Sequence, residues 1–441
     1  MEASKRSGAR QAALECLERS RRDGAWSGNV IDHAIKKYAL DSRDAALVSR
    51  LTLGVLQNIS LCDFYIDSFC RGKLEPKVRD ILRSGIYQLL FMDKIPARAA
   101  VSESVELCRS LGYARAAGLV NAVLRRVDRE RDKLPKIPGE GSAQYLSILY
   151  SQPLWLVEDV IERKGYEHCE AFLRENNSQR GLTIQVNRTK VSAQDYARAL
   201  SRQDIAYVQA EGLDGCIELE GGAADKLPGF DEGLFYVQDR AARMAVEIAG
   251  PRPGMKVLDC CASPGGKSFA AAIAMEDQGS ILSCDIHEKK LSLIRSGAER
   301  LGLDIISTTA HDARTIQSQE KDSYDLVIAD VPCSGLGLLA KKPEIRFKSK
   351  EEIEGLPKIQ LDILKAVSKA VKPGGLLLYS TCTILKEENE ELVESFLSGN
   401  DEFLLEPFSV AGLNCPEGMH CFWPNIDGTD GFFAARLRRK I

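Results

Sequence analysis

Two cysteines each follow an apolar run of the sequence, at a position where a side chain could do chemistry. Cys333 stands in D-V-P-C-S-G after the run that ends at Asp330, and Cys382 stands in S-T-C-T after G-G-L-L-L. Pro332 cannot continue a strand, so it should turn Cys333 into a loop at the strand end. A thiolate is a strong nucleophile, and a carboxylate beside it can move a proton. Because cysteine is among the most buried residue types, a pair of structural thiols is the alternative.

A glycine turn is the second place where the sequence indicates chemistry. Residues 257–268 have the sequence V-L-D-C-C-A-S-P-G-G-K-S, which predicts a strand, a turn and a helix. Glycines let the backbone approach a ligand closely, and the helix N-terminus offers free N–H groups and the positive end of a dipole. We therefore expect the turn to bind a ligand with an anionic group. An ordinary connection between a strand and a helix is the alternative.

The ligand of this turn is expected to be a nucleoside without a phosphate chain to hold. The pattern G-x-x-x-x-G-K-[ST] would end at 266–268 but requires glycine where Cys261 stands. The pattern G-x-G-x-x-G is absent, because the nearby glycines are adjacent. A second apolar run, 280–284, leads into Asp285, which is placed to accept hydrogen bonds from ribose hydroxyls.

Strands and helices must alternate to position these residues. From residue 254 onward, apolar runs are separated by segments of helix length, and the pattern predicts a doubly wound parallel sheet with helices on both faces. These runs are 255–258, 281–284, 324–329 and 374–379, and 431–437 follows as a final strand. Ligands of such sheets bind at the carboxyl ends of the strands. The two cysteines, Asp285 and Asp330 should therefore meet at one crevice.

The rest of the chain predicts two further modules. Apolar residues recur at helical spacing in the first part, as at Leu47, Leu51 and Val55. After a linker with two prolines, a helical pattern and two strands, 182–187 and 233–239, predict a small α+β subdomain. The expected all-α domain, linker, α+β subdomain and sheet domain are residues 1–132, 133–144, 145–250 and 251–441.

Charge is distributed unevenly along the chain. The net charge is −4, but residues 1–140 carry 25 Lys and Arg against 18 Asp and Glu. A basic module joined to an acidic one suggests a polyanionic partner for the first module. A solvated helical surface is the alternative, because charge alone does not distinguish the two.

Composition limits the class of protein. Hydrophobic residues make up 44% of the 441 residues and charged residues 28%, which are ordinary values for a soluble protein of two or three domains. No apolar run has the length of a membrane span, and no signal peptide is evident. The thirteen cysteines include no C-x-x-C pair, so we expect reduced thiols, a cytoplasmic location and no metal site. Cys415, His420 and Cys421 lack a second half-site for a metal.

Four blocks of sequence together resemble a known family. The blocks D-C-C-A-S-P-G-G-K, S-C-D, D-V-P-C-S-G and S-T-C-T match, in order, the RNA cytosine-C5 methyltransferases of the NOL/NOP/Sun type. The match is closest to the bacterial Sun/Fmu/RsmB branch, which modifies 16S ribosomal RNA of the small subunit. L-R-S-G-I-Y-Q-L-L and G-L-V-N-A-V-L-R-R resemble its N-terminal NusB-type domain. The resemblance implies a Rossmann-like class I methyltransferase domain, preceded by an all-α NusB-like domain and a small α+β RNA-binding subdomain.

The resemblance also implies a cofactor, a partner and site residues. The cofactor would be S-adenosyl-L-methionine and the partner RNA, with the protein a monomer. Asp285 matches the ribose-binding acid, and Asp312 matches the acid on the adenine side. Cys382 matches the nucleophile, Cys333 the cysteine that assists release, and Asp330 an acid that serves both cofactor and catalysis. The residues that match the cofactor loop are Cys261, Ala262, Ser263, Pro264, Gly265, Gly266 and Lys267.

The sequence departs from the family pattern at two positions. Ser263 stands where the family usually has alanine, and it is small enough to leave the turn intact. Cys260 replaces a more usual aliphatic residue, and we assign it no role. Three alternatives remain: a cytosine-C5 methyltransferase that acts on another RNA such as tRNA, a P-loop-like NTPase, and a non-enzymatic RNA-binding factor. Cys261 argues against the NTPase, and an RNA-binding factor would not account for two cysteines at strand ends.

Overall fold

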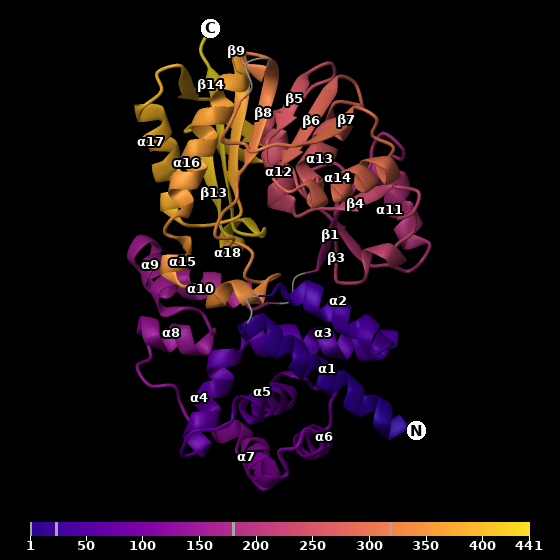
Figure 1. The fold of residues 1–441 in the computed structure, drawn as a ribbon, viewed down its shortest axis with the longest axis vertical. Helices are drawn as coiled ribbons and strands as arrows, with labels where there is room; N and C mark the ends of the chain where they lie inside the picture. The colour runs from indigo at the N-terminus through magenta and orange to yellow at the C-terminus, as the bar shows by residue number, and fades with distance from the viewer. Residues whose placement is uncertain (1, 23–24, 179–180, 317–319) are drawn as a thin grey trace. The chain divides into compact units, whose positions relative to one another are not determined.

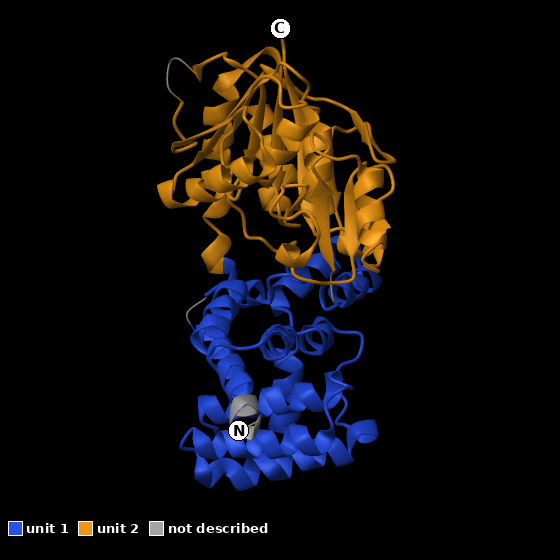
Figure 2. Ribbon diagram, turned by 90° about the vertical axis from the view of Figure 1, so that its right-hand side faces the viewer, with its two compact units in different colours: residues 1–178, 339–350 blue, residues 179–338, 351–441 orange. Residues whose placement is uncertain are grey.

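The chain divides into two compact units in the computed structural model, which describes residues 2–22, 25–178, 181–316 and 320–441. The first unit comprises residues 1–178 and 339–350, and the second comprises residues 179–338 and 351–441 (Figure 2). The chain therefore enters the second unit, returns to the first for residues 339–350, and leaves it again. This return begins a few residues after Cys333.

The described residues of the first unit form helices and turns and no strand (Figure 1). Its helices alternate with short turns, and their apolar faces form one core in which Leu51, Val55 and Leu124 are completely buried. The helical spacing predicted around Leu51 is thus confirmed. The helices are α1 (Glu2–Arg22), α2 (Ser27–Lys37), α3 (Ser42–Gln57), α4 (Ile59–Phe69), α5 (Pro76–Phe91), α6 (Ala97–Ser110), α7 (Ala117–Arg129), α8 (Ala143–Leu149), α9 (Leu154–Lys164) and α10 (Tyr166–Asn176).

The returning segment is fixed to the first unit by a buried arginine. Arg346 lies in the short 3-10 turn Pro343–Phe347 and is only 4% exposed. Its Nη1 donates to the backbone oxygens of Gln57 at 2.7 Å and Ser151 at 3.3 Å. One guanidinium thereby joins the end of α3, the turn after α8 and the returning segment.

The second unit begins with a small antiparallel sheet in the order β2-β3-β1-β4. The two predicted strands of this region are β1 and β4. The sheet packs its apolar side chains against α11 (Ala193–Ser201), where Tyr196 and Leu200 are buried. The strands are β1 (Leu182–Val186), β2 (Tyr207–Gln209), β3 (Cys216–Leu219) and β4 (Phe235–Val237).

A larger sheet follows, in the order β10-β14-β9-β8-β5-β6-β7, with β13 paired to β14. The five strands β9, β8, β5, β6 and β7 lie side by side in that order and run parallel. From β5 the chain first adds β6 and β7 on one side and then adds β8 and β9 on the other side. The strands are β5 (Lys256–Asp259), β6 (Ser280–Asp285), β7 (Ile306–Ala310), β8 (Tyr324–Asp330), β9 (Val371–Thr381), β10 (Phe403–Leu405), β13 (Met419–Phe422) and β14 (Phe432–Arg439). A separate two-stranded sheet joins β11 (Phe408–Val410) and β12 (Leu413–Cys415).

Helices cover both faces of this sheet, as the sequence predicts. Leu326 and Ile328 of β8 contribute to one core, whereas Val327 and Ala329 contribute to the other. The first core contains α12 (Arg240–Ala249), α13 (Gly266–Ala274) and α14 (Glu288–Leu301), and the second contains α16 (Leu356–Val367) and α17 (Glu390–Ser398) (Figure 1).

One prediction about the sheet was too simple, because the sheet is not parallel throughout. β14 runs antiparallel to β9, and β10 and β13 run antiparallel to β14. β13 leads into β14 through the short segment 423–431, which is enough to join an antiparallel pair, whereas a parallel pair needs a crossover. An antiparallel edge on an otherwise parallel sheet is common in large α/β proteins.

No single helix among the described residues is long and apolar enough to cross a membrane. In the described part of the chain, α3 and α4 together have the length and apolar composition of a span, but the pair is bent by 75°.

Replacing Arg346 with alanine should destabilise the first unit. Among the described residues, the change removes the only side-chain donor to the buried backbone oxygen of Ser151 and one of the two donors to that of Gln57, which keeps Asn177 Nδ2. It should cost about 1–3 kcal/mol of unfolding free energy. Urea unfolding followed by far-UV circular dichroism would measure the loss. Lys350→Ala removes an exposed cation from the same segment and serves as the control. Equal stability of the two variants would contradict the role of Arg346.

Candidate active site

The parallel pairing of β8 and β9 brings the two predicted cysteines together. Asp330 of β8 is the register partner of Ser380 in β9, so both strands end at the same edge of the sheet. Cys333 follows β8 by three residues, and Cys382 follows β9 directly. The predicted meeting of the two strand ends is therefore confirmed.

The two thiols are in direct contact. The Sγ atoms of Cys333 and Cys382 lie 3.0 Å apart, and the backbone N–H of Cys382 donates to Cys333 Sγ at 3.3 Å. Both residues are half-buried. The hydrogen bond with Cys382, burial and the charge of Glu388 together raise the pKa of Cys333 well above its usual value. Cys333 is therefore a protonated thiol at neutral pH.

Asp330 is held on both carboxylate oxygens. Ser380 Oγ donates to Oδ1 at 2.8 Å, and Lys267 Nζ contacts Oδ2 at 2.7 Å. Lys267 is 8% exposed and also lies 5.0 Å from the centroid of the Phe432 ring. The Asp330 side chain keeps 31% exposure, so a bound molecule can still reach it. Lys267 thus links the glycine turn to the strand end beside the cysteines.

The glycine turn has a backbone that only glycine adopts readily. Gly265 has φ +113°, and a Cβ atom at this position would lie 2.5 Å from the Phe269 ring. The turn connects β5 to α13, as predicted, and α13 begins at Gly266. The N–H groups of the first turn of α13 are free of helical partners, which makes this end of the helix suited to an anionic group.

A buried carboxyl group lies under this turn. Asp259 ends β5, is 0% exposed, and accepts a hydrogen bond from Ser268 Oγ at 2.7 Å. Ser268 Oγ also lies 2.7 Å from Ser283 Oγ of β6. The pKa of Asp259 is raised to about 7, mainly by burial and also by the charge of Asp330, whereas the hydrogen bond from Ser268 opposes the shift. The hydrogen bonds of Asp259 and Ser268 therefore join β5, α13 and β6. The Asp259 carboxyl group loses its proton near pH 7.

The two remaining predicted acids follow neighbouring strands. Asp285 ends β6, is 8% exposed, and accepts the N–H of His287 at 2.8 Å. The N–H of His311 donates to the backbone oxygen of Asp285 at 3.1 Å, which joins the ends of β6 and β7. Asp312 is paired with Arg314 at 2.6 Å, and this partner lowers the pKa of Asp312 to about 2. Asp312 stays half-exposed and ionised.

Several residues around the cysteines were not predicted from the sequence. Ser380 orients Asp330, and its place beside the S-T-C-T block was the available signal. Gln360, Glu388 and Asn389 are buried and polar, and they surround the segments that carry the two thiols. Glu388 and Asn389 stand in an acidic stretch, E-E-N-E, that by sequence resembles a solvated helix start.

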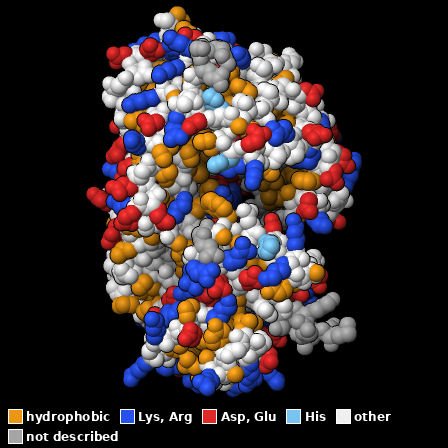
Figure 3. Space-filling view, viewed as in Figure 1, with side chains coloured by type: hydrophobic (Ala, Val, Ile, Leu, Met, Phe, Trp, Pro, Cys, Tyr) orange, Lys and Arg blue, Asp and Glu red, His pale blue; other side chains and the backbone are white. Residues whose placement is uncertain are grey.

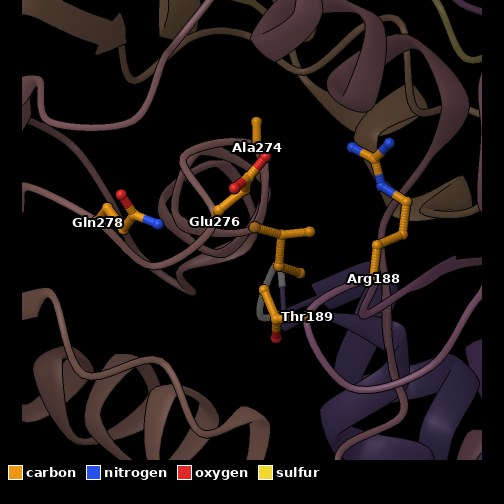
Figure 4. A pocket seen from close by; sticks show the side chains of 6 residues that line it. Arg188, Thr189, Ala274, Glu276 and Gln278 are labelled. Atoms are coloured by element: carbon orange, nitrogen blue, oxygen red, sulfur yellow. The ribbon is translucent and has the colours of Figure 1, made fainter.

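A polar pocket of about 480 Å³ lies elsewhere in the second unit (Figure 4). Arg188 and Thr189 line it together with Ala274, Glu276 and Gln278. The last three residues belong to the C-terminal end of α13 and the turn beyond it, whereas the glycine turn is at the N-terminal end. The pocket is thus distinct from the predicted cofactor turn. Among the described residues, no group of three or more His, Cys, Asp or Glu side chains could hold a metal ion.

Three family models match the chain in succession. The NusB family model matches residues 7–129, and a ferredoxin-like domain of RsmF/B-like methyltransferases matches residues 152–224. The model of the 16S rRNA methyltransferase RsmB/F matches residues 246–438. The NusB match spans α1 to α7, the ferredoxin-like match spans α9 to β3, and the RsmB/F match spans the strands of the large sheet.

Relatives match the chain over its whole length. Probable ribosomal RNA small subunit methyltransferase B of Bacillus subtilis is 32% identical, over 99% of this chain and 100% of the relative. The protein with the same description from Synechocystis is 34% identical, over 98% of this chain and 99% of the relative. The crystal structure of PH0851 is 26% identical with a TM-score of 0.81, covering 97% of this chain and 98% of that one.

The buried carboxyl of Asp259 should make stability depend on pH. Its pKa is raised in the folded state, so its contribution is fully present below the unfolded pKa near 3.9 and is lost as pH rises to about 7. Relative to Asp259→Asn, the unmodified protein should lose up to about 1.4 kcal/mol per pH unit between pH 5 and 7.

Thermal unfolding of both proteins across pH 5 to 8 would measure this difference. Asp312→Asn is the control, because the lowered pKa of Asp312 confines its effect to the window between about 2 and the unfolded value. A pH-independent difference between Asp259→Asn and the unmodified protein would contradict a shifted pKa at Asp259.

Proposed function

The chain belongs to the family of ribosomal RNA small subunit methyltransferase B, and from this premise we propose that it transfers a methyl group to C5 of a cytosine in 16S ribosomal RNA through a covalent adduct. Membership makes it an S-adenosylmethionine-dependent RNA methyltransferase and removes the NTPase and the non-enzymatic factor as alternatives. The observation that carries the cytosine chemistry is the 3.0 Å contact of two thiols beside Asp330.

The residues of the glycine turn fit S-adenosylmethionine. Gly265 supplies the positive φ that the turn requires, and the start of α13 offers N–H groups to a carboxylate. Asp285, at the end of the next strand, can accept hydrogen bonds from the ribose hydroxyls. Asp312 lies beyond β7, on the side proposed for adenine. The cofactor would supply an electrophilic methyl group.

Attack on the base is assigned to Cys382. C5 of cytosine is a poor nucleophile, so a thiolate must first add to C6 and make C5 enamine-like. Bond formation between Sγ and C6 pushes electron density toward N3 and the exocyclic nitrogen. Asp330, fixed by Ser380 and Lys267, can stabilise that part of the ring through a hydrogen bond or a proton. C5 then takes up the methyl group.

Release is assigned to Cys333. After methyl transfer, C5 loses its proton to a base, the electron pair restores the C5–C6 double bond, and the C6–S bond breaks. Cys382 then leaves as a thiolate. Cys333 remains a thiol at neutral pH and lies 3.0 Å from that sulfur, so it can stabilise the leaving thiolate by donating an S–H···S hydrogen bond. The pair thereby divides attack and release between two thiols.

RNA binding is assigned in part to the helical unit. The excess of Lys and Arg lies in residues 1–140, and Figure 3 shows such side chains over the end of the unit where Figure 1 has α7. Arg126 and Arg129 pair with Glu130, whereas Arg125 contacts only the neutral Asn121 among the bonds formed on α7. Exposed guanidinium groups of this kind suit phosphate contacts. A target cytosine also has to be unstacked, which favours single-stranded or loop RNA.

Replacing Asp285 with alanine should weaken binding of S-adenosylmethionine. Hydrogen bonds to a charged group contribute about 1.5–3 kcal/mol, so the dissociation constant should rise roughly 10- to 100-fold. Isothermal titration calorimetry measures this directly. Glu276→Ala removes an exposed acid beyond the other end of α13 and should leave affinity unchanged. Unchanged affinity in the Asp285 variant would remove that residue from the cofactor site.

The two cysteines should behave differently when each is replaced by alanine. Cys382→Ala should abolish both methyl transfer and the covalent RNA adduct, because the attacking thiol is lost. Cys333→Ala should still attack and methylate but release slowly, so a denaturant-resistant protein–RNA complex should accumulate. A denaturing gel after incubation with 16S RNA and S-adenosylmethionine would detect the complex, and bisulfite sequencing would locate the modified base.

The control for this experiment is Cys421→Ala, which removes a half-buried thiol from β13. It should methylate and release like the unmodified protein. A trapped complex with Cys382→Ala and none with Cys333→Ala would reverse the two assignments. Full turnover in both variants would reject the thiol mechanism.

A further inference from the structure

Two adjacent buried polar residues follow the Cys382 segment. Glu388 ends the short 3-10 turn η7 (Lys386–Glu388), and Asn389 precedes α17. They are 1% and 0% exposed. Buried polar side chains are costly unless their hydrogen bonds are satisfied, so their partners indicate what these residues do.

Glu388 is hydrogen-bonded to the loop on both sides of Cys333, directly on one side and through Gln360 on the other. Its Oε2 accepts the backbone N–H of Ser334 at 2.9 Å and Nε2 of Gln360 at 2.7 Å. The same Gln360 nitrogen donates to the backbone oxygen of Pro332 at 3.0 Å. The residues before and after Cys333 are therefore both held by one carboxylate–amide pair from the η7 turn and α16.

Asn389 is bonded on both sides of Cys382. Its Oδ1 accepts the hydroxyl of Thr381 at 2.6 Å, and its Nδ2 donates to the backbone oxygen of Thr383 at 3.0 Å. Asparagine at the N-cap of a helix ordinarily bonds to the helix's own N–H groups. Asn389 occupies the N-cap of α17 but makes no side-chain cap hydrogen bond. Its amide serves the Cys382 segment instead.

A direct bond joins the two held segments. Ser334 Oγ donates to Thr383 Oγ1 at 2.7 Å, so the residue after Cys333 contacts the residue after Cys382. Tyr379 Oη donates to the backbone oxygen of Glu388 at 2.6 Å, which fixes the η7 turn against β9. The separation of the two sulfur atoms is therefore set by a network that leaves little freedom to either segment.

We propose that Glu388 and Asn389 are positioning residues that act on different steps, with Glu388 and Gln360 holding Cys333 for release and Asn389 holding Cys382 for attack. The inference rests on the proposed function, because the two steps exist only in a thiol mechanism. It goes further by assigning a separate step to each of two neighbouring residues that do not touch the base. Neither forms nor breaks a bond in the reaction.

The roles are expected to be positional, because hydrogen bonds to backbone and hydroxyl groups carry them. Both bonds to Glu388 end on one oxygen, so glutamine can keep them while removing the charge. Misplacement of a reacting group by about 1 Å can cost on the order of 100-fold in rate. Loss of either set of bonds should therefore slow its own step by roughly 10- to 100-fold.

The test measures the two steps separately in the full-length protein with 16S RNA. Single-turnover methyl transfer reports attack, and decay of the denaturant-resistant complex reports release. Glu388→Ala and Gln360→Leu should methylate at nearly the normal single-turnover rate but accumulate the complex. Asn389→Ala should slow methyl transfer without accumulating it. Glu388→Gln should restore release, and Glu387→Ala, which removes the exposed acid next to it, should behave like the unmodified protein.

Three outcomes would overturn the inference. Equal slowing of both steps in Glu388→Ala and Asn389→Ala, with lowered thermal stability, would make the network merely structural. Normal release by both Glu388→Ala and Gln360→Leu would remove them from that step. Trapping by Glu388→Gln as strong as by Glu388→Ala would assign the effect to charge instead of position.

Cys333→Ala, run in parallel, separates this inference from the proposed function. If that variant traps a complex while the Glu388 and Gln360 variants release normally, only the positioning inference fails. If neither Cys333→Ala nor any other variant yields a complex, the thiol mechanism fails and the positioning inference fails with it.

Discussion

The parallel register of β8 and β9 is the constraint on which the site depends. It pairs Asp330 with Ser380, and so places the residues after both strands at the same edge of the sheet. A shift of one of these strands by one residue would turn its alternating side chains toward the opposite faces of the sheet. Leu326 and Val327, which belong to different cores, make such a shift costly. Packing on both faces of the sheet thus fixes the distance between two thiols that are far apart in the sequence.

The features predictable from the sequence are those that local patterns determine. The apolar runs located β5, β6, β8, β9 and β14 because central strands of a sheet covered on both faces consist largely of apolar residues. β7, with the sequence I-S-T-T-A, was missed because it is an edge strand with exposed polar side chains. The antiparallel direction of β14 was also missed, since direction depends on which strand it pairs with and not on its own residues.

In the site, too, local sequence motifs predict some residues, whereas others are recognised only from the tertiary structure. The glycine turn and the two cysteine blocks have recognisable short motifs, and the structure brings Asp330, Cys333 and Cys382 together. The supporting residues carry no such motif. Glu388 stands in an acidic stretch whose sequence resembles a solvated surface. In the structure its side chain is buried and accepts a hydrogen bond from Gln360. Lys267 belongs by sequence to the cofactor turn, yet its amine contacts Asp330 across the sheet edge. Contacts of this kind depend on tertiary structure and cannot be inferred from spacing.

Contact between the two thiols also constrains the order of protonation. Two thiolates with their sulfur atoms 3.0 Å apart would repel each other strongly, so a half-buried pair favours one negative charge at a time. The buried carboxylate of Glu388 adds to the cost of a charge on Cys333, which raises the pKa of that thiol. The backbone N–H of Cys382 also points at Cys333 Sγ, so the two residues are coupled through the main chain as well as through their sulfur atoms. Two chemically identical side chains therefore have different surroundings, because Cys333 accepts the N–H of Cys382 and lies near Glu388, and this difference distinguishes the two thiols before any RNA binds.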